Sequence, residues 1–208
     1  MKDLIIIGAS GHGKVCTEIA EATGRYGDIV FLDDDRNLKS CGRYPVVGVS
    51  DDVARYLSDD VEFFVSIGNS GFRSRIQDKV LKVGGRIATL VHPDSTVSPS
   101  AILGDGVAIM AGSVINADAR IGDGVIVNTC SSIDHDCTIG DYCHVAVGAH
   151  VCGTVSLGSH TWIGAGAIIS NNLSICDNCL IGVGAVVVSD IEVPGTYVGV
   201  PVRRRCTE

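Results

Sequence analysis

An apolar residue recurs at every sixth position through the second half of the chain, and this period limits the possible folds more than any other feature. From Val97 to Val193, all seventeen residues spaced by six are Val, Leu or Ile, with no insertion. A period of six fits neither an amphipathic helix nor a half-buried strand. It fits a parallel β-solenoid, in which each hexad supplies a short strand and a turn, and three hexads close one triangular coil.

A second row, four residues after each of these positions, consists mostly of small or β-branched side chains. Cys137, Cys143 and Cys179 lie on this row. The chain has nine cysteines, an odd number, so we expect them to pack as small apolar residues rather than to form a disulfide framework. Cys176 and Cys179 form a CxxC pair, but a zinc site would need a second pair at matching spacing, so no metal is expected.

Residues 1–91 have a different pattern, in which short apolar runs alternate with amphipathic segments. Such alternation predicts an α/β domain with a parallel sheet. We expect strands at 4–7, 29–32, 45–47, 61–67 and 86–91, and helices at 14–23, 51–57 and 72–83. In the first helix we expect Val15, Ile19 and Ala22 to face the core. The boundary falls at Val91, which gives an α/β domain over 1–91 and a solenoid with its tail over 92–208.

The first strand of the α/β domain leads into the glycine-rich sequence Gly8–Gly13, of the form GxxGxG. This order differs from the dinucleotide fingerprint and is a weak signal alone, although a helix N-terminus there would favour a phosphate. Acidic residues 33–35 close the second strand, and Gly68–Asn69 follow a later one. Because parallel strands end at one edge of a sheet, the three segments predict a nucleotide site.

The solenoid carries four histidines, of which His135 has the most informative neighbours. It lies in the sequence Asp134-His135-Asp136, at the turn of a hexad. A carboxylate beside a histidine holds its ring and raises its basicity, which suits a general base. His144 lies half a coil further on and points elsewhere in one subunit. We expect His150 and His160 to be ordinary exposed turn residues.

Charge and hydropathy exclude several classes of function. The formal net charge of −8 argues against broad nucleic-acid binding, and no apolar stretch is long enough to span a membrane. Residues 1–3 precede a short apolar run that turns directly into the glycine loop, so no signal peptide and a cytoplasmic location are expected. Between Val91 and Val202 the only basic side chain is Arg120.

Taken whole, the chain resembles the sialic acid/bacillosamine-type sugar acetyltransferases, which belong to the hexapeptide-repeat acyltransferases. The resemblance rests on the segments 8–13, 31–34, 67–69, 133–137 and 198–201. It implies an α/β, Rossmann-like N-terminal domain followed by an all-β left-handed parallel β-helix, and a homotrimer with coenzyme A between adjacent solenoids. It is strongest to enzymes that use acetyl-CoA to acetylate the 4-amino group of UDP-linked amino sugars; a dTDP-linked sugar is the second possibility.

The resemblance also assigns roles to individual residues. His135 matches the family's general base, and Asp136, where close relatives often have Glu, matches the acid that supports it. Residues matching acetyl-CoA contacts are His144, Gly153, Ala165, Gly182 and Val183. Residues matching the nucleotide-sugar contacts are Ser10, Gly11, His12, Asp33, Asp34 and Gly68.

Coenzyme A brings phosphates, and the acidic solenoid offers few cations to meet them. Arg203, with Arg204 and Arg205 beside it, follows Pro201 directly after the last coil. We therefore expect Arg203 to contribute to cofactor binding.

Three other functions remain open at this point. An O-acetyltransferase acting on sialic acid or a related sugar would use the same residues. A non-catalytic solenoid that binds a nucleotide sugar would not need His135 beside Asp136. A zinc enzyme like the trimeric carbonic anhydrases of this fold would need an H-x4-H spacing, and no two of the four solenoid histidines have that spacing.

Overall fold

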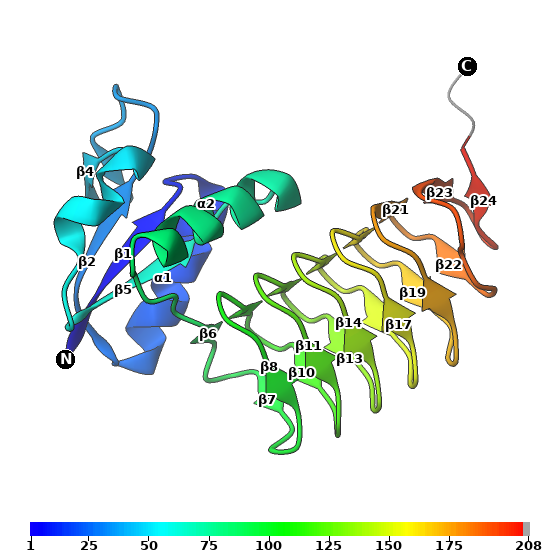
Figure 1. The fold of residues 1–208 in the computed structure, drawn as a ribbon. Coiled ribbons are helices and arrows are strands. Elements are labelled where there is room, and N and C mark those ends of the chain that lie inside the picture. The colour runs from blue at the N-terminus through cyan, green and yellow to red at the C-terminus, as the bar shows by residue number, and fades with distance from the viewer. Residues whose placement is uncertain (206–208) are drawn as a thin grey trace. The chain divides into compact units, whose positions relative to one another are not determined.

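The computed structural model describes residues 1–205 and divides into two compact units, Met1–Pro93 and a second unit that begins at Asp94 (Figure 1). The sequence placed this boundary two residues earlier. Each unit is described by itself.

The first unit is a mainly parallel sheet with two helices. The strand order is β3-β4-β2-β1-β5, in which β1 pairs in parallel with β2 and β5, and β3 joins β4 as an antiparallel edge hairpin. Its elements are β1 (Lys2–Ile7), α1 (Gly11–Thr23), β2 (Tyr26–Leu32), β3 (Ser40–Cys41), β4 (Tyr44–Gly48), the 3₁₀ helix η1 (Ser50–Tyr56), β5 (Val61–Val65) and α2 (Ser70–Lys82). The carboxyl ends of β1, β2 and β5 share one edge of the sheet. This edge brings together the three segments expected to form a nucleotide site, which are Gly8–Gly13, residues 33–35 and Gly68–Asn69.

The structure corrects the expected core face of α1. Ile19 is buried, but Val15 and Ala22 are exposed. The buried face consists of Gly13, Cys16, Thr17, Ile19 and Ala20. This set follows the i, i+3, i+4, i+7 spacing of a helix that begins at Gly11 rather than at residue 14.

The strand expected over residues 86–91 is also wrong in most of its length. Phe63 donates to the carbonyl of Arg86, and Ala88 donates back to Phe63, so that only an isolated bridge at Ile87 joins this segment to β5. The strand β6 (Leu90–Val91) is two residues long. The backbone therefore leaves this sheet after one bridge.

The second unit is a parallel β-helix whose coils stack in register (Figure 1). Strands that lie three hexads apart pair in parallel, as Val114 does with Ser132 and Ser132 with His150. The expected three-hexad coil is thus confirmed. The strands are β7 (Thr96–Val97), β8 (Ile102–Leu103), β9 (Ala108–Ile109), β10 (Val114–Ile115), β11 (Arg120–Ile121), β12 (Ile126–Val127), β13 (Ser132–Ile133), β14 (Thr138–Ile139), β15 (His144–Val145), β16 (His150–Val151), β17 (Ser156–Leu157), β18 (Trp162–Ile163), β19 (Ile168–Ile169), β20 (Ser174–Ile175), β21 (Cys179–Ile181), β22 (Val186–Val187), β23 (Gly195–Val198) and β24 (Arg203–Arg204).

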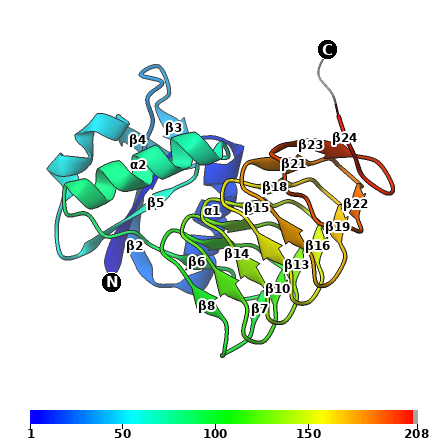
Figure 2. The same cartoon turned by 45° about the vertical axis from the view of Figure 1, so that its right-hand side comes forward.

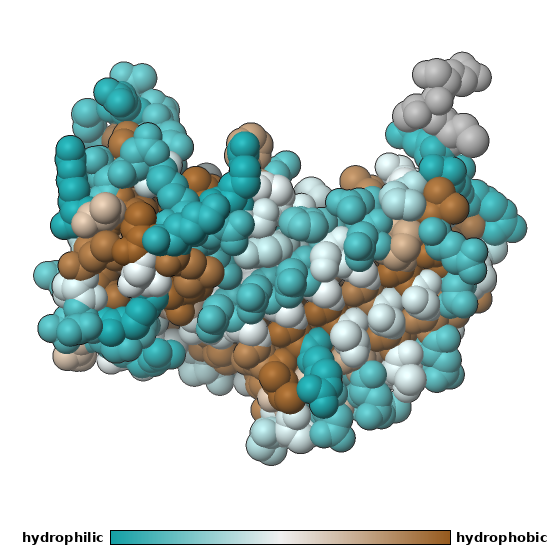
Figure 3. Space-filling view, viewed as in Figure 1, coloured by the Kyte–Doolittle hydropathy of each residue, from teal (hydrophilic) through white to brown (hydrophobic). Residues whose placement is uncertain are grey.

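The coils have three faces, each of them a ladder of every third strand. The first ladder runs from β7 through β10, β13, β16 and β19 to β22, and the second from β8 through β11, β14 and β17 to β20. The third runs through β9, β12, β15, β18 and β21, and it ends with β23 and, antiparallel to it, β24. In the turned view, strands of successive coils lie over one another along each face (Figure 2). On the surface, apolar and polar residues separate into bands along the stack (Figure 3).

The apolar row fills the interior of the β-helix. All fourteen of its members from Ile109 to Val187 are buried, as are Cys137, Cys143 and Cys179 on the second row. The expected last member, Val193, is 49% exposed, which corrects the period at its end. Ile191 takes the inward place instead and bridges to Ile175, because this last turn is two residues shorter than a regular hexad.

From Gly106 to Gly184, every sixth residue lies in a turn of the β-helix and has the left-handed backbone conformation. Six of these fourteen residues are glycine, and eight are larger, including Asp136 and Tyr142. The turn geometry therefore dominates the intrinsic preference of the residue, which is of the order of 1 kcal/mol.

Some glycines outside these left-handed positions are required for lack of space. Substitution of these glycines should therefore reduce stability by a different amount. A Cβ on Gly140 would lie 2.6 Å from the backbone nitrogen of Ser159 and 2.9 Å from the carbonyl carbon of Gly158, whereas a Cβ on Gly148 would meet nothing within 4 Å. We expect Gly140→Ala to destabilise the β-helix by about 3 kcal/mol, and Gly148→Ala by about 1 kcal/mol. Urea unfolding followed by the fluorescence of Trp162, the only tryptophan, reports on this unit alone. Equal midpoints for the two variants would contradict the close approach of the coils at Gly140.

Candidate active site

His135 lies on the turn that follows β13, with its side chain 58% exposed. Its Nδ1 lies 2.8 Å from Oδ2 of Asp136. A carboxylate only accepts hydrogen bonds, so Nδ1 carries the proton and Nε2 carries the lone pair. This is the arrangement in which a neutral imidazole can accept a proton from a third group.

The local charges favour protonation of His135. The hydrogen bond to Asp136 is the main cause that raises the pKa of His135. Burial opposes this rise, and the charges of Asp134 and Asp136 add smaller contributions in the same direction as the hydrogen bond. Asp134 is itself held by the backbone nitrogen of His135 at 2.9 Å, and this hydrogen bond is the main cause that lowers the pKa of Asp134. The two acids expected to flank the base therefore both act on it.

Gly153 lies on the next coil, three hexads after His135, against the imidazole ring. A Cβ on Gly153 would lie 2.6 Å from Nε2 and 2.7 Å from Cε1 of His135. Glycine at this position leaves the ring its place beside Asp136. The structure thus brings together His135, Asp136 and Gly153 of the predicted site.

A second group of predicted residues gathers on the β15–β18–β21 face. The ring of His144 stacks on Trp162 with centroids 5.2 Å apart, and its Nε2 lies 3.0 Å from Nδ2 of Asn128. Beside them is an almost entirely apolar cavity of about 230 Å³. Its lining consists of Ala146, Trp162, Gly164, Ala165, Leu180, Ile181, Gly182 and Val183. Predicted residues Ala165, Gly182 and Val183 thus meet, while sequence reasoning missed Asn128 and Trp162.

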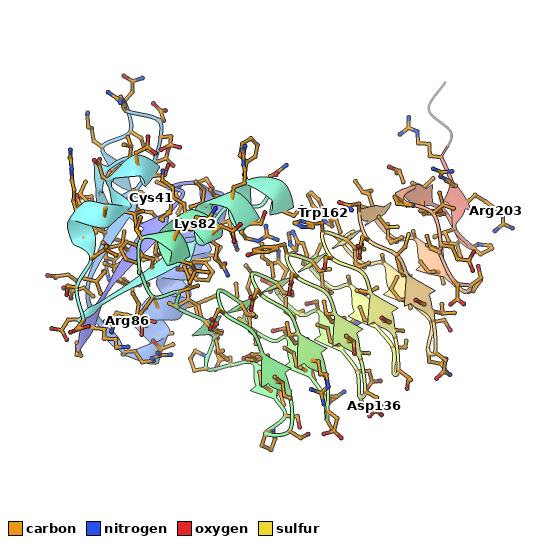
Figure 4. The ribbon with its side chains drawn as sticks, viewed as in Figure 1. Cys41, Lys82, Arg86, Asp136, Trp162 and Arg203 are labelled. Atoms are coloured by element: carbon orange, nitrogen blue, oxygen red, sulfur yellow. The ribbon has the colours of Figure 1, made fainter. Side chains whose placement is uncertain are left out.

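The base and the cavity belong to different faces of the β-helix. His135 follows β13 in the first ladder, whereas the cavity is built on strands of the third. Figure 4 shows the same separation, with Asp136 and Trp162 at opposite edges of the coils. Within one chain, the predicted catalytic residues do not meet the predicted acetyl-CoA residues.

Four of the residues expected to contact the nucleotide sugar, Ser10, Asp33, Asp34 and Gly68, meet at the carboxyl edge of the first unit's sheet. A cavity of about 280 Å³ is lined by Ile7, Gly8, Ser10, Leu32, Asp33, Asp34, Ser50, Ser66, Ile67, Gly68 and Ile76. Asp33 accepts a hydrogen bond from the backbone nitrogen of Ala9 at 2.7 Å, and so holds the glycine loop. Asp34 instead binds the backbone nitrogen and the hydroxyl of Ser50, at 2.8 and 3.1 Å. Both acids thus shape the cavity that they line.

Gly11 and His12 lie on the first turn of α1 and are not among the residues that line this cavity. Nothing lies within 4 Å of a Cβ on Gly11, so this turn faces open space. Burial, with a smaller contribution from the charge of Arg73, lowers the pKa of His12 to about 4, so its ring is neutral at pH 7. Arg73 is buried and donates to the carbonyls of Ile67 and Gly68, a role that the sequence did not indicate.

The other features considered in the sequence are the cysteines, possible metal ligands, possible membrane spans and the C-terminal arginines. The cysteines among residues 1–205 are free thiols, with Sγ of Cys176 and Cys179 3.6 Å apart. In the same range, no three His, Cys, Asp or Glu side chains are arranged to hold a metal ion. No helix of the described part of the chain is long and apolar enough to cross a bilayer. Arg203 and Arg204 form β24, and Arg203 is exposed.

The chain is similar to known proteins over its whole length. The PglD N-terminal domain family matches residues 3–80. UDP-N-acetylbacillosamine N-acetyltransferase of Bacillus subtilis (strain 168) is 35% identical over 113 residues, which are 53% of this chain and 52% of that protein. The match therefore spans about half the length of this curated relative.

Solved structures resemble the chain more completely. The acetyltransferase domain of PglB from Neisseria gonorrhoeae FA1090 is 40% identical, with 99% of this chain and 100% of that chain covered and a TM-score of 0.95. The same domain is also known in complex with acetyl coenzyme A. PerB from Caulobacter crescentus, in complex with CoA and GDP-perosamine, is 34% identical, with 99% and 98% covered and a TM-score of 0.93.

The fold and these similarities define a hexapeptide-repeat acyltransferase, with a Rossmann-like domain ahead of a left-handed parallel β-helix. Within that class, the chain belongs to the family of the bacillosamine-type sugar acetyltransferases.

The contact between Gly153 and His135 predicts a change in titration without a loss of stability. In Gly153→Ala, the new Cβ displaces the imidazole from Asp136, and we expect the raised pKa of His135 to fall towards its ordinary value. Because the displaced atoms are the far end of an exposed side chain, the urea midpoint should hardly change. NMR titration of the histidine ring measures this. An unchanged His135 titration in the variant would contradict the predicted displacement.

Proposed function

We propose that the protein transfers the acetyl group of acetyl-CoA to the 4-amino group of a UDP-linked amino sugar, with His135 as general base. The observation that carries the proposal is the His135–Asp136 pair, whose basic Nε2 points to the space beside Gly153. The relative from Bacillus subtilis is named for a UDP-sugar, and PerB was solved with GDP-perosamine. Both names support an amino sugar attached to a nucleoside diphosphate, and the curated name favours UDP.

The chemistry follows from the protonation states at the base. The ammonium form of the sugar has no lone pair and is deprotonated before it can attack. Nε2 of His135 takes a proton from the attacking amine, and Asp136 stabilises the resulting imidazolium through Nδ1. The amine nitrogen bonds to the thioester carbonyl carbon, the C–S bond breaks, and coenzyme A leaves as a thiol. A backbone N–H, for which Gly153 is our candidate, stabilises the oxyanion.

The apolar cavity on the β15–β18–β21 face suits the pantetheine arm of acetyl-CoA. The arm is narrow and largely uncharged, and the lining combines apolar side chains with Gly164 and Gly182, which leave the backbone accessible. His144 is held beside it by Trp162 and Asn128. For the phosphates we propose Arg203 as one exposed cation at the end of the β-helix.

The nucleotide-sugar site is proposed for the first unit. The cavity that includes Ser10, Asp33, Asp34 and Gly68 lies at the carboxyl edge of a parallel sheet, where α/β proteins bind such ligands. Gly11 and His12 open the helix that follows the glycine loop, at the end of α1 that favours a phosphate. A neutral His12 would add a hydrogen-bonding group without an extra charge.

The proposed base is tested by release of the coenzyme A thiol from acetyl-CoA, with UDP-, dTDP- and GDP-linked amino sugars as acceptors. We expect the UDP-sugar to react best, and His135→Ala to lower kcat about 10²- to 10⁴-fold, as loss of a general base does. Asp136→Asn should cost less. His160→Ala is the matched control, because that ring stacks on Tyr142 at another edge of the coil. Near-wild-type turnover of His135→Ala would show that another group takes the proton.

The separation of the base from the cavity predicts a homotrimer. A site that needs both can form only if His135 of one chain meets the cavity of a neighbour, and cyclic assembly around a three-fold axis supplies such a contact to every chain. We expect the full chain to sediment as a trimer at micromolar concentration. A monomer that retains full acetyltransferase activity would contradict this arrangement.

A further inference from the structure

We propose that Asn116 is a positioning residue for His135 and that it acts through Asp134. This inference rests on the proposed function, in which His135 is the base. Asn116 lies three hexads before Asp134 and therefore at the same place on the preceding coil. Its Nδ2 donates a hydrogen bond of 2.8 Å to Oδ1 of Asp134, and the same oxygen accepts the backbone N–H of His135 at 2.9 Å.

The His135–Asp136 pair depends on the conformation of its backbone. Side chains of neighbouring residues in an extended segment point to opposite sides. These two meet because Asp136 has the left-handed φ of 57° that forms the turn. The nitrogen of Asp136 donates to the carbonyl of Ala117 at 3.0 Å, and the nitrogen of His135 is held by Asp134. The preceding coil therefore holds the backbone after the base directly, and it holds the backbone before the base through the bond of Asn116 to Asp134.

The following coil fixes the remaining polar group of this residue. The carbonyl of His135 accepts from the backbone nitrogen of Thr154 at 2.9 Å, while Gly153 lies against the ring. These supports of the backbone are main-chain groups except Asp134, whose side chain could rotate towards solvent. The bond from Asn116 opposes that rotation, so Asn116 controls the one side-chain support of the backbone at His135, while Asp136 holds the ring.

Asp134 contributes its charge as well as its shape. The hydrogen bonds from His135 and Asn116 lower the pKa of Asp134, and its charge is one of the influences that raise the pKa of His135. The other charged groups at this edge are Asp136 on the same turn and Asp118 at the matching place on the preceding coil. The following coil has the uncharged Thr154 there. Geometry and charge can therefore be separated by substitution.

The first arm of the test removes the donor. Asn116→Ala should lower kcat about 10- to 100-fold, because a small displacement of a catalytic group has such an effect, and it should leave KM for acetyl-CoA and for the sugar nucleotide unchanged. Asn116→Leu, which is close to asparagine in size and loses the donor without adding a charge, should show the same loss even if the alanine variant folds poorly.

Ser100→Ala is the matched control. It removes a similar side-chain bond between coils at the same edge, from the nitrogen of Asp118 to Oγ of Ser100 at 3.0 Å, one coil further from the base. We expect wild-type kcat in this control. An equal loss in Ser100→Ala would mean that the effect is general loosening of the coils, and would overturn the proposal.

The second arm separates charge from position. Asp134→Asn keeps an oxygen that can accept from Asn116 and from His135, but removes the charge that raises the pKa of His135. A base with a lower pKa stays neutral to lower pH, so the acidic limb of the kcat profile should move to lower pH while its plateau stays within a few-fold of wild type. Asp134→Ala loses both and should show the lower plateau.

Different results would contradict the proposed function and the positioning role of Asn116. Full activity of His135→Ala removes the proposed base, and the proposed function with it. Loss of activity in His135→Ala together with wild-type kcat in both Asn116 variants would overturn only the positioning role. A rise in KM without a fall in kcat would also overturn it, because Asn116 would then act on substrate binding.

Discussion

The backbone ladder that joins each residue of the β-helix to the residue three hexads away determines almost everything else about this unit. Because the coils contain three hexads without insertion, a side chain keeps the same face and the same neighbours along the stack. His135 lies between Ala117 and Gly153, and His144 lies between Ile126 and Trp162 for that reason alone. A single inserted residue would separate both histidines from their partners.

Because of the same register, the space available to a turn side chain depends on the residue three hexads further on. A turn residue can be bulky, as Tyr142 is, provided that the next coil leaves room. Beside His135 the next coil has Gly153, so the ring can lie against the backbone of that coil. His12 in the other unit has the opposite environment. Burial lowers its pKa, whereas carboxylates raise that of the exposed His135, so the two histidines suit different tasks at one pH.

Much of the fold could be predicted from the sequence because the hexad period is a local pattern with one structural solution. The exceptions lie where tertiary packing decides. Val193 has the right type and spacing, but a short turn puts Ile191 inside instead. Val15, Ile19 and Ala22 share a face by helical spacing, but α1 packs through the neighbouring face that contains Cys16 and Ala20. The segment at 86–91 has strand-like residues, yet makes only one bridge to β5.

The candidate site could also be predicted in part from the sequence. His135 and Asp136 are neighbours in sequence, so their contact needed little of the fold. Asn116 and Trp162 were missed, although a step of three hexads from Asp134 and from His144 leads to them. Arg73 gave no comparable signal, because its contact with Gly68 depends on how α2 packs beside β5.

The distribution of charge adds a constraint on how an anionic ligand could approach the β-helix. Between Val91 and Val202 only Arg120 is basic, so an approaching diphosphate meets mostly carboxylates or an uncharged surface. Arg203 and Arg204 are consecutive in β24, and consecutive strand residues point to opposite sides, so the cluster cannot act as one patch. Arg204 donates to the carbonyl of Pro194 at 2.9 Å, and Arg203 donates to that of Val202 at 2.8 Å. Each guanidinium has further N–H donors for a phosphate, and the contribution proposed for Arg203 should weaken as salt screens the attraction.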